Sequence, residues 1–504
     1  MPIRFSAIIL IFIALFGSAI YVFHLFGLVT AANEVYVRFI ALGIFIAGFG
    51  FLGWQKARHH RFSWDDIYKN NTLIIATLTV LLTSLFLYQE ISHYAIGIFV
   101  GASFVHFLYT RKFYPPNKLF YFVFLYALLL FFRTIGTEHG FHFPDRTLAF
   151  YVLPLAFCFF QLSKDTLLKI AEVFFKTTIL FLAICVLYWW YNFLHLDANF
   201  IQWITEKTNH LAQMTGWETQ ATTHHSLENV VTRDTLIYYS GYFFVNSWSG
   251  FTHPTFVSII LFFGLIVGFY LYYKKNTFLS ITKLDLALYI VLCFFVILLM
   301  QSRVGIVGFL IIICISSLYY LKYRTKFFKL GLLLLFVFGS TALYVTDLSE
   351  SRFTTDETRD VLRQVSVSYI KENFWWGAGF RQERIVLQRQ AEKMENVLAD
   401  VPPHILDTIS YSHNQFLGDT VQFGIWGFIV LMAMLVAIAL YAIRSRSYLL
   451  QMFLCSMFLI MLIDQPLYIQ TGITRFMVFL VFFTAISEPE SRKFYLIKNE
   501  PTET

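Results

Sequence analysis

The chain has 504 residues, of which 58% are hydrophobic, 19% aromatic and only 14% charged. Soluble globular domains carry about 25% charged residues, so this composition excludes a soluble secreted enzyme, a disordered chain and a collagen-like fibre. The net charge of +7 is spread over short loops, which argues against nucleic acid as a partner and is typical of membrane topology. The composition therefore predicts a polytopic membrane protein.

Fourteen apolar runs approach the length of about 20 residues that a helix needs to cross a bilayer. We therefore expect an all-α, polytopic integral membrane protein of about 14 transmembrane helices, or about 12 if the shortest runs do not span. The first run is too long for a cleavable signal and is expected to be a signal anchor. In chain order the runs are residues 6–29, 37–54, 72–89, 93–109, 119–133, 147–163, 170–196, 254–273, 284–301, 304–321, 328–346, 417–442, 449–464 and 472–487.

Lysine and arginine gather in the loops on one side of these runs, such as residues 56–69 and 322–329. The positive-inside rule makes that side cytoplasmic, with both termini inside. Short loops on the other side hold only the four arginines Arg38, Arg133, Arg146 and Arg475, all near span ends. The chain then divides into five parts: N-terminal helices 1–196, a first outer loop 197–253, helices 254–346, a large outer loop 347–416, and C-terminal helices with a cytoplasmic tail, 417–504.

The large outer loop is expected to be ordered and functional, since loops longer than about 15 residues usually are functional or disordered. Leu362, Val365 and Tyr369 share one face of a predicted amphipathic helix. Trp375 and Trp376 follow it. These features predict a partly helical cap that lies on the membrane.

The predicted span interiors contain almost no ionisable residues, and Lys176 and Asp464 are interpreted as near-interface groups. Ion-driven pumps carry such residues at mid-bilayer depth, so a pump is disfavoured. A polysaccharide flippase or exporter would also need a polar cavity lined by charges from many spans. The five cysteines lie in apolar runs, which predicts no disulfides. No Walker A loop, D-x-D pair or metal-ligand spacing is present, so neither a metal nor a cofactor is expected.

Three polar patches map to the outer face. Ser302-Arg303 forms the turn between the runs 284–301 and 304–321, where an arginine could hold a phosphate through two hydrogen bonds. The alternative is a snorkelling or cap-forming arginine. Arg359 precedes Trp375-Trp376-Gly377-Ala378-Gly379-Phe380-Arg381, where the glycines permit a tight turn. The alternative is an aromatic interface anchor.

The third patch is Ser412-His413-Asn414-Gln415, directly before the run 417–442. A histidine at this position can accept a proton near neutral pH. The alternative is a histidine at headgroup level without a chemical role.

These patches resemble the motifs of the O-antigen ligase and O-antigen polymerase superfamily of bacterial membrane glycosyltransferases. His413-Asn414, nine residues and Gly424-x-x-Gly427 match the pattern H-[NSQ]-x9-G-x-x-G. Ser302-Arg303 is similar to the S-R motif, and Arg359 with Gly377-Ala378-Gly379 to the R…P-x-x-G-x-G motif, with Phe374 where proline is common. Residues 250–255, which include His253, resemble the G-x-F-x-H-P-N motif before the run 254–273. Together the motifs cover about residues 245–430.

One departure from the superfamily lies in the first outer loop. Many ligases place a second essential arginine there, whereas residues 246–249 are Asn-Ser-Trp-Ser. Arg233 or Lys207 are candidates to substitute for it.

The resemblance implies a GT-C-like fold in a bacterial inner membrane, with its active site facing the periplasm. It implies transfer of a glycan from a polyprenyl diphosphate (undecaprenyl diphosphate) donor to a hydroxyl acceptor such as lipid A-core, with inversion and without metal. The catalytic residues would be His413, Arg303 and Arg359, and the substrate-binding residues would be Ser302, Asn414, His253, Gly377, Gly379 and Arg381. The alternatives are an O-antigen or exopolysaccharide polymerase and a protein O-oligosaccharyltransferase.

Overall fold

A computed structural model describes residues 71–86, 89–132, 147–194, 254–274, 281–300, 302–320, 357–380, 382–394, 398, 411–488 and 494–496. The predicted all-α class is confirmed, because helices form nearly all of these residues. The helices are α4 (Thr72–Ser84), α5 (Gln89–Thr110), α6 (Leu119–Phe132), α7 (Ala149–Ala156), α8 (Lys164–Leu194), α13 (Pro254–Lys274), α14 (Lys283–Leu299), α15 (Arg303–Tyr320), α18 (Glu357–Glu372), α19 (Glu383–Lys393), α21 (Gln415–Phe423), α22 (Ile425–Arg444), α23 (Tyr448–Met461) and α24 (Gln470–Ser487).

Four of the described helices are long and apolar enough to cross a membrane: Ser92–Thr110, Thr255–Lys274, Ile425–Arg444 and Gln470–Ser487. Shorter apolar helices cover Thr72–Ser84, Leu119–Phe132, Val304–Tyr319 and Tyr448–Met461. These helices agree with predicted runs and confirm a membrane protein. The runs predicted at 6–29, 37–54 and 328–346 lie outside the described residues.

Two predicted runs have different limits in the structure. The run 147–163 gives only the eight-residue α7. The prediction of one continuous span over 417–442 was wrong, because Gly424 separates α21 from α22. Gly424 has φ 65° and ψ −158°, a conformation that is essentially open only to glycine. The chain therefore changes direction inside a run that was predicted to be one helix.

The core of the bundle lies around α13 and α24. In each of these two spans 83% of residues are buried, against 33% in α22 and 28% in α5, which places α5 and α22 at the periphery. The Phe263 ring of α13 packs 5.3 Å from Phe453 and 4.2 Å from Phe479 between ring centroids. Aromatic packing of this kind fills the space between the central helices at close distance.

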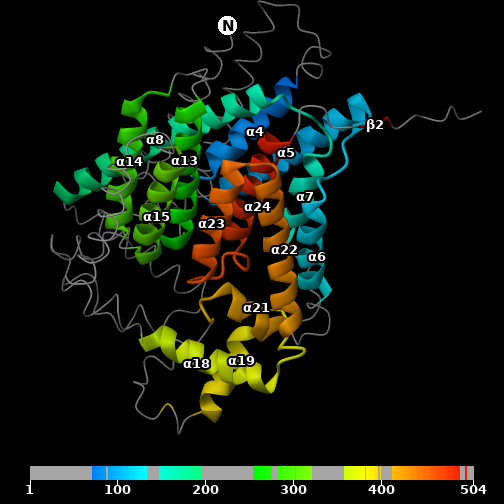
Figure 1. Cartoon of the computed structure of the whole chain (residues 1–504), viewed down its shortest axis with the longest axis vertical. Helices are drawn as coiled ribbons and strands as arrows, with labels where there is room; N and C mark the ends of the chain where they lie inside the picture. The colour runs from blue at the N-terminus through cyan, green and yellow to red at the C-terminus, as the bar shows by residue number, and fades with distance from the viewer. Residues whose placement is uncertain are drawn as a thin grey trace, which may run out of the picture.

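The two ends of the bundle carry different structures. At one end α18 and α19 lie beyond α21, whereas β2 lies at the other end (Figure 1). Strand β1 (Lys112–Phe113) follows α5 and pairs antiparallel with β2 (Tyr495–Leu496) from the C-terminal tail. Segments predicted on opposite sides of the membrane thus lie at opposite ends of the bundle, and α18 and α19 belong to the predicted outer end.

The predicted amphipathic helix in the large outer loop is confirmed as α18. Leu362, Val365 and Tyr369 are all buried, and they form a small hydrophobic cluster with Leu387 of α19 and Val421 of α21. This cluster is separate from the main core. It holds the two outer helices against α21.

Candidate active site

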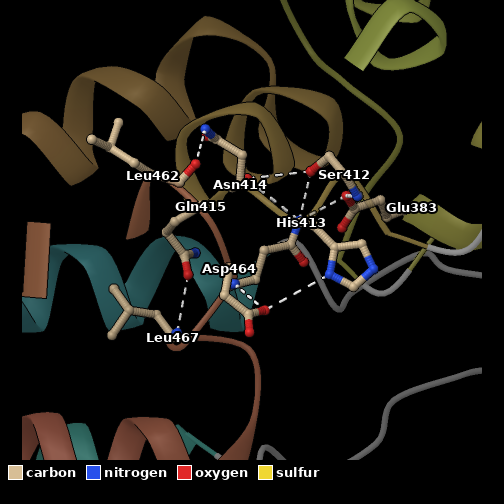
Figure 2. A network of polar contacts seen from close by, with 9 residues as sticks. Glu383, Ser412, His413, Asn414, Gln415, Leu462, Asp464 and Leu467 are labelled. Carbon is tan, nitrogen blue, oxygen red and sulfur yellow. Dashed lines mark hydrogen bonds and ion pairs between the residues drawn. The ribbon is translucent and has the colours of Figure 1, made fainter. Parts of the chain in front are cut away.

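His413 lies at the turn that leads into α21. Asn414 is the N-cap of this helix: its Oδ1 accepts a hydrogen bond from Leu417 N at 3.0 Å. Its Nδ2 donates to the backbone oxygen of Leu462 at 2.9 Å, which ties the turn to the end of α23. His413 itself has φ 47°, a left-handed conformation that is uncommon for residues other than glycine. The cap and the turn fix the backbone that carries the imidazole (Figure 2).

Asp464 faces the imidazole of His413. The His413 Nδ1 atom lies 3.9 Å from Asp464 Oδ1, and the two side chains are 38% and 11% exposed. The distance is beyond a normal hydrogen bond, but within that of an ion pair, which the two side chains form when the imidazole is protonated. Because Nδ1 faces Asp464 (Figure 2), the Nε2 atom on the opposite edge of the ring is the one suited to meet a substrate.

Glu383 of α19 holds the backbone just before His413. Its Oε1 accepts from Ser412 N at 2.8 Å and from Gln465 Nε2 at 2.9 Å. Its Oε2 accepts from Gln422 Nε2 at 2.9 Å. The side chain is fully buried, and this burial raises the pKa of the Glu383 carboxyl although the donors around it oppose the shift. One carboxyl group therefore joins α19, α21 and the connection between α23 and α24.

Asp419 occupies a second buried polar cluster on α21. It accepts hydrogen bonds from the Tyr126 hydroxyl at 3.2 and 3.1 Å, from Gln415 Nε2 at 3.1 Å, and from the Tyr468 hydroxyl. Burial raises the pKa of Asp419 to about 7, with the hydrogen bonds acting in the opposite direction. This cluster anchors α21 to α6 and to the residues that precede α24.

The glycine-rich turn after α18 packs directly on the junction between α21 and α22. Ala378 N donates to Val421 O at 2.9 Å, Gly379 N to Gln422 O at 2.7 Å, and Ile425 N to Phe374 O at 2.8 Å. A Cβ on Gly377 would lie 2.5 Å from Gly424 N, and one on Gly424 would lie 2.4 Å from the backbone of Trp375. The glycines of two predicted motifs thus permit contact between two stretches of backbone.

The structure brings some predicted site residues together. His413 and Asn414 share the turn before α21, and Gly377 and Gly379 pack at the far end of the same helix. Ser302 is buried and caps α15, since its Oγ accepts from Gly305 N at 3.0 Å. Arg359 is exposed on the first turn of α18.

Other predicted site residues lie wholly or partly outside the residues that the structure describes. Arg303 begins α15, but its side chain lies outside the described part of the molecule. His253 and Arg381 lie outside it entirely, as do Arg233 and Lys207.

Sequence reasoning missed three carboxylates of this region, namely Glu383, Asp419 and Asp464. Asp464 was expected near the interface, which agrees with its place just after α23, but its proximity to His413 was not expected. Asp419 had a detectable signal, because it is an acidic residue within a predicted apolar run. Within the described residues, no group of three or more His, Cys, Asp and Glu side chains could hold a metal ion.

Comparison with known families supports the resemblance. The O-antigen ligase family model matches residues 288–432, and a comparison with curated proteins finds no matching relative. The matched stretch begins within α14 and ends within α22. It contains Ser302-Arg303, Arg359, the Gly377–Gly379 turn and the motif from His413 to Gly427, whereas Asp464 lies beyond it. Over residues 288–432 the chain is similar to the O-antigen ligase family, as its motifs predict.

Proposed function

We propose that the protein transfers a glycan from a polyprenyl diphosphate carrier to a hydroxyl of lipid A-core at the periplasmic face of a bacterial inner membrane. The observation that carries this proposal is the arrangement of His413 opposite Asp464, at the end of the bundle where the large outer loop packs. The family match over residues 288–432 supports the general class, that of O-antigen ligases and polymerases. The donor, the acceptor and the residue roles are parts of the proposal.

The reaction would proceed in one displacement at the anomeric carbon of the donor sugar. The acceptor hydroxyl oxygen forms the new bond to this carbon, while the bond from the carbon to the diphosphate oxygen breaks. The acceptor proton passes to His413 Nε2, and the diphosphate leaves with the electron pair. Attack from the face opposite the leaving group inverts the configuration. Because the donor bond is already activated, the step needs neither nucleotide hydrolysis nor a further co-reactant.

Asp464 would stabilise the positive charge that His413 gains during this step. A carboxylate near Nδ1 orients the imidazole and favours its protonated form, as in other histidine bases. Glu383 would act one step further away, by fixing the backbone of Ser412. Arg303 and Arg359 would neutralise the charge that develops on the leaving diphosphate, which is the role that cations play in phosphoryl and pyrophosphoryl departure.

The test compares His413→Ala and Asp464→Asn with a matched acidic control, Asp360→Asn. Asp360 is exposed and pairs with Arg363 on the surface of α18, so its loss should leave transfer unchanged. His413→Ala should abolish glycan transfer with protein levels near normal, and Asp464→Asn should lower it by about 10²-fold or more, the scale of general-base catalysis. Full transfer by His413→Ala would refute the proposed chemistry.

A deletion strain distinguishes the acceptors, because lipopolysaccharide, free lipid-linked glycan and glycoproteins are profiled together. Accumulated long lipid-linked chains with loss of surface-attached chains support the ligase. Single repeat units that remain attached identify a polymerase instead. Unchanged lipopolysaccharide with unglycosylated proteins identifies a protein O-oligosaccharyltransferase.

A further inference from the structure

The outer end of the central helices contains a buried polar layer that the proposed reaction does not yet use. Arg475 of α24 is only 4% exposed. Buried hydroxyl residues stand at the same end of the central helices: Thr471 and Thr474 on α24, Ser258 on α13, and Ser302 before α15. The rest of α13 and α24 is almost wholly apolar. A charged group in such surroundings needs an explanation, since arginine is rarely fully buried without a partner.

The helix register places Arg475 level with the turn at Ser302. Phe263 and Phe479 are in contact, and each is the tenth residue of its helix. Arg475 precedes Phe479 by one turn on the same side of α24, and Ser258 precedes Phe263 by a little more than one turn on α13. Ser258 Oγ in turn lies 3.4 Å from Ser302 Oγ. The Cα atoms of Ser258 and Arg475 therefore lie at a similar depth, about 6 to 8 Å inside the outer ends of α13 and α24.

The charge of Arg475 has no compensation in the described part of the protein. Its Nη1 atom is buried without a hydrogen-bond partner, and no ion pair joins Arg475 to a described carboxylate. A guanidinium stays charged at all physiological pH values, and an uncompensated buried charge is strongly destabilising. The N-terminus of α15 adds positive potential at the same depth, because helix N-termini favour anions. The uncompensated positive charge in this layer therefore favours the binding of an anion.

We propose that Arg475 binds the diphosphate of the lipid-linked donor, and so supplies the second arginine that is absent from residues 246–249. The proposal rests on the proposed function. The guanidinium would donate hydrogen bonds to non-bridging oxygens of the two phosphates. Because the side chain is buried, the donor reaches it only by separating the outer ends of the helices that cover it. Arg475 is then a donor-binding residue from the last helix, outside the stretch that matches the ligase family.

The experiment measures both stability and binding on the full-length protein in detergent, for the wild type, Arg475→Met, Arg475→Lys and the control Arg444→Met. Arg444 is exposed at the far end of α22. The probes are undecaprenyl diphosphate, undecaprenyl monophosphate and inorganic diphosphate. Without a ligand, Arg475→Met should melt at the same temperature as the wild type or higher, because it removes an uncompensated charge. Its affinity for undecaprenyl diphosphate should fall about 10- to 100-fold, the loss expected for charged hydrogen bonds.

The outcomes separate this inference from the proposed function. Wild-type protein that fails to bind undecaprenyl diphosphate overturns the proposed function. Wild-type protein that binds, with equal binding by Arg475→Met, overturns only the role of Arg475. A lower melting temperature for both Arg475→Met and Arg475→Lys assigns the arginine a structural role and also overturns the inference. Competition by inorganic diphosphate with the lipid in the wild type, lost in Arg475→Met, supports contact between the diphosphate and Arg475; competition that is equal in both proteins overturns it.

Discussion

Replacing Gly424 by alanine should separate the glycine-rich turn from α21 and α22. The backbone conformation of Gly424 costs a non-glycine residue about 1–3 kcal/mol. The new Cβ would also lie 2.4 Å from the carbonyl carbon and oxygen of Trp375, and these backbone atoms cannot rotate away. Relief requires breaking the three backbone hydrogen bonds that join the turn to the helix junction, which are worth about 0.5–1.5 kcal/mol each.

Amide hydrogen exchange measures this separation directly. Ala378 and Gly379 donate two of the three hydrogen bonds, so their amides should exchange about 30-fold faster or more in Gly424→Ala, corresponding to about 2 kcal/mol. Gly97→Ala is the matched control, because its Cβ meets nothing within 4 Å. Unchanged exchange at Ala378 and Gly379 in a folded Gly424→Ala protein would refute the reasoning.

Three further predictions concern the buried carboxylates and the exposed aromatics. Glu383→Gln places an amide donor against other donors and should lower the free energy of unfolding by about 1–3 kcal/mol. The same change at the exposed Glu392 of the same helix should leave the free energy of unfolding nearly unchanged, and equal effects of the two changes in denaturation would contradict this. The folded state holds a proton on Asp419 more tightly than the unfolded state, with a pKa of about 7 against 3.8. The stabilisation that this proton gives is complete below about pH 4 and is lost as the pH rises towards 7. The melting temperature of Asp419→Asn should therefore depend less on pH between about pH 4 and 7 than that of the wild type. An equal pH dependence of the two melting temperatures would argue against this. Trp375 and Trp376 are 61% and 70% exposed, and we expect both to contact lipid. Brominated lipids should then quench a smaller fraction of the tryptophan fluorescence after both are changed to Phe, and an unchanged fraction would count against the contact.

The helices could be predicted from sequence where hydropathy or periodicity marks both of their ends. α13 and α24 fall within two residues of the predicted limits, because polar loops flank each apolar run. α18 could be predicted from the spacing of its apolar residues. The break at Gly424 could not, since an apolar run looks the same whether or not a glycine within it turns the chain. The turn around Gly377, which packs against Gly424, belongs to another part of the chain and leaves no mark in the run itself.

The candidate site could be predicted only where the sequence contains a motif. His413 and the glycines belong to short patterns with fixed spacing. Asp464 and Glu383 are single acidic residues, and their partners lie far away in the chain, so no local pattern indicates that they meet the segment around His413. Arg475 was noted only as a charge near a span end. Its burial depends on how α24 packs against its neighbours, which the sequence of α24 does not contain.

The bonds of Glu383 also bear on how substrates arrive. This carboxyl group accepts from three segments, and the glycine-rich turn adds three backbone bonds to the same helix junction. Swinging α18 and α19 away from α21 would break all six, at a cost of several kcal/mol, and would also expose the small cluster around Leu362. Opening the site by moving α18 and α19 away from α21 is therefore energetically unfavourable. The proposed lipid-linked donor would therefore enter laterally from the bilayer, between the outer ends of the helices, while α18 and α19 stay packed against α21.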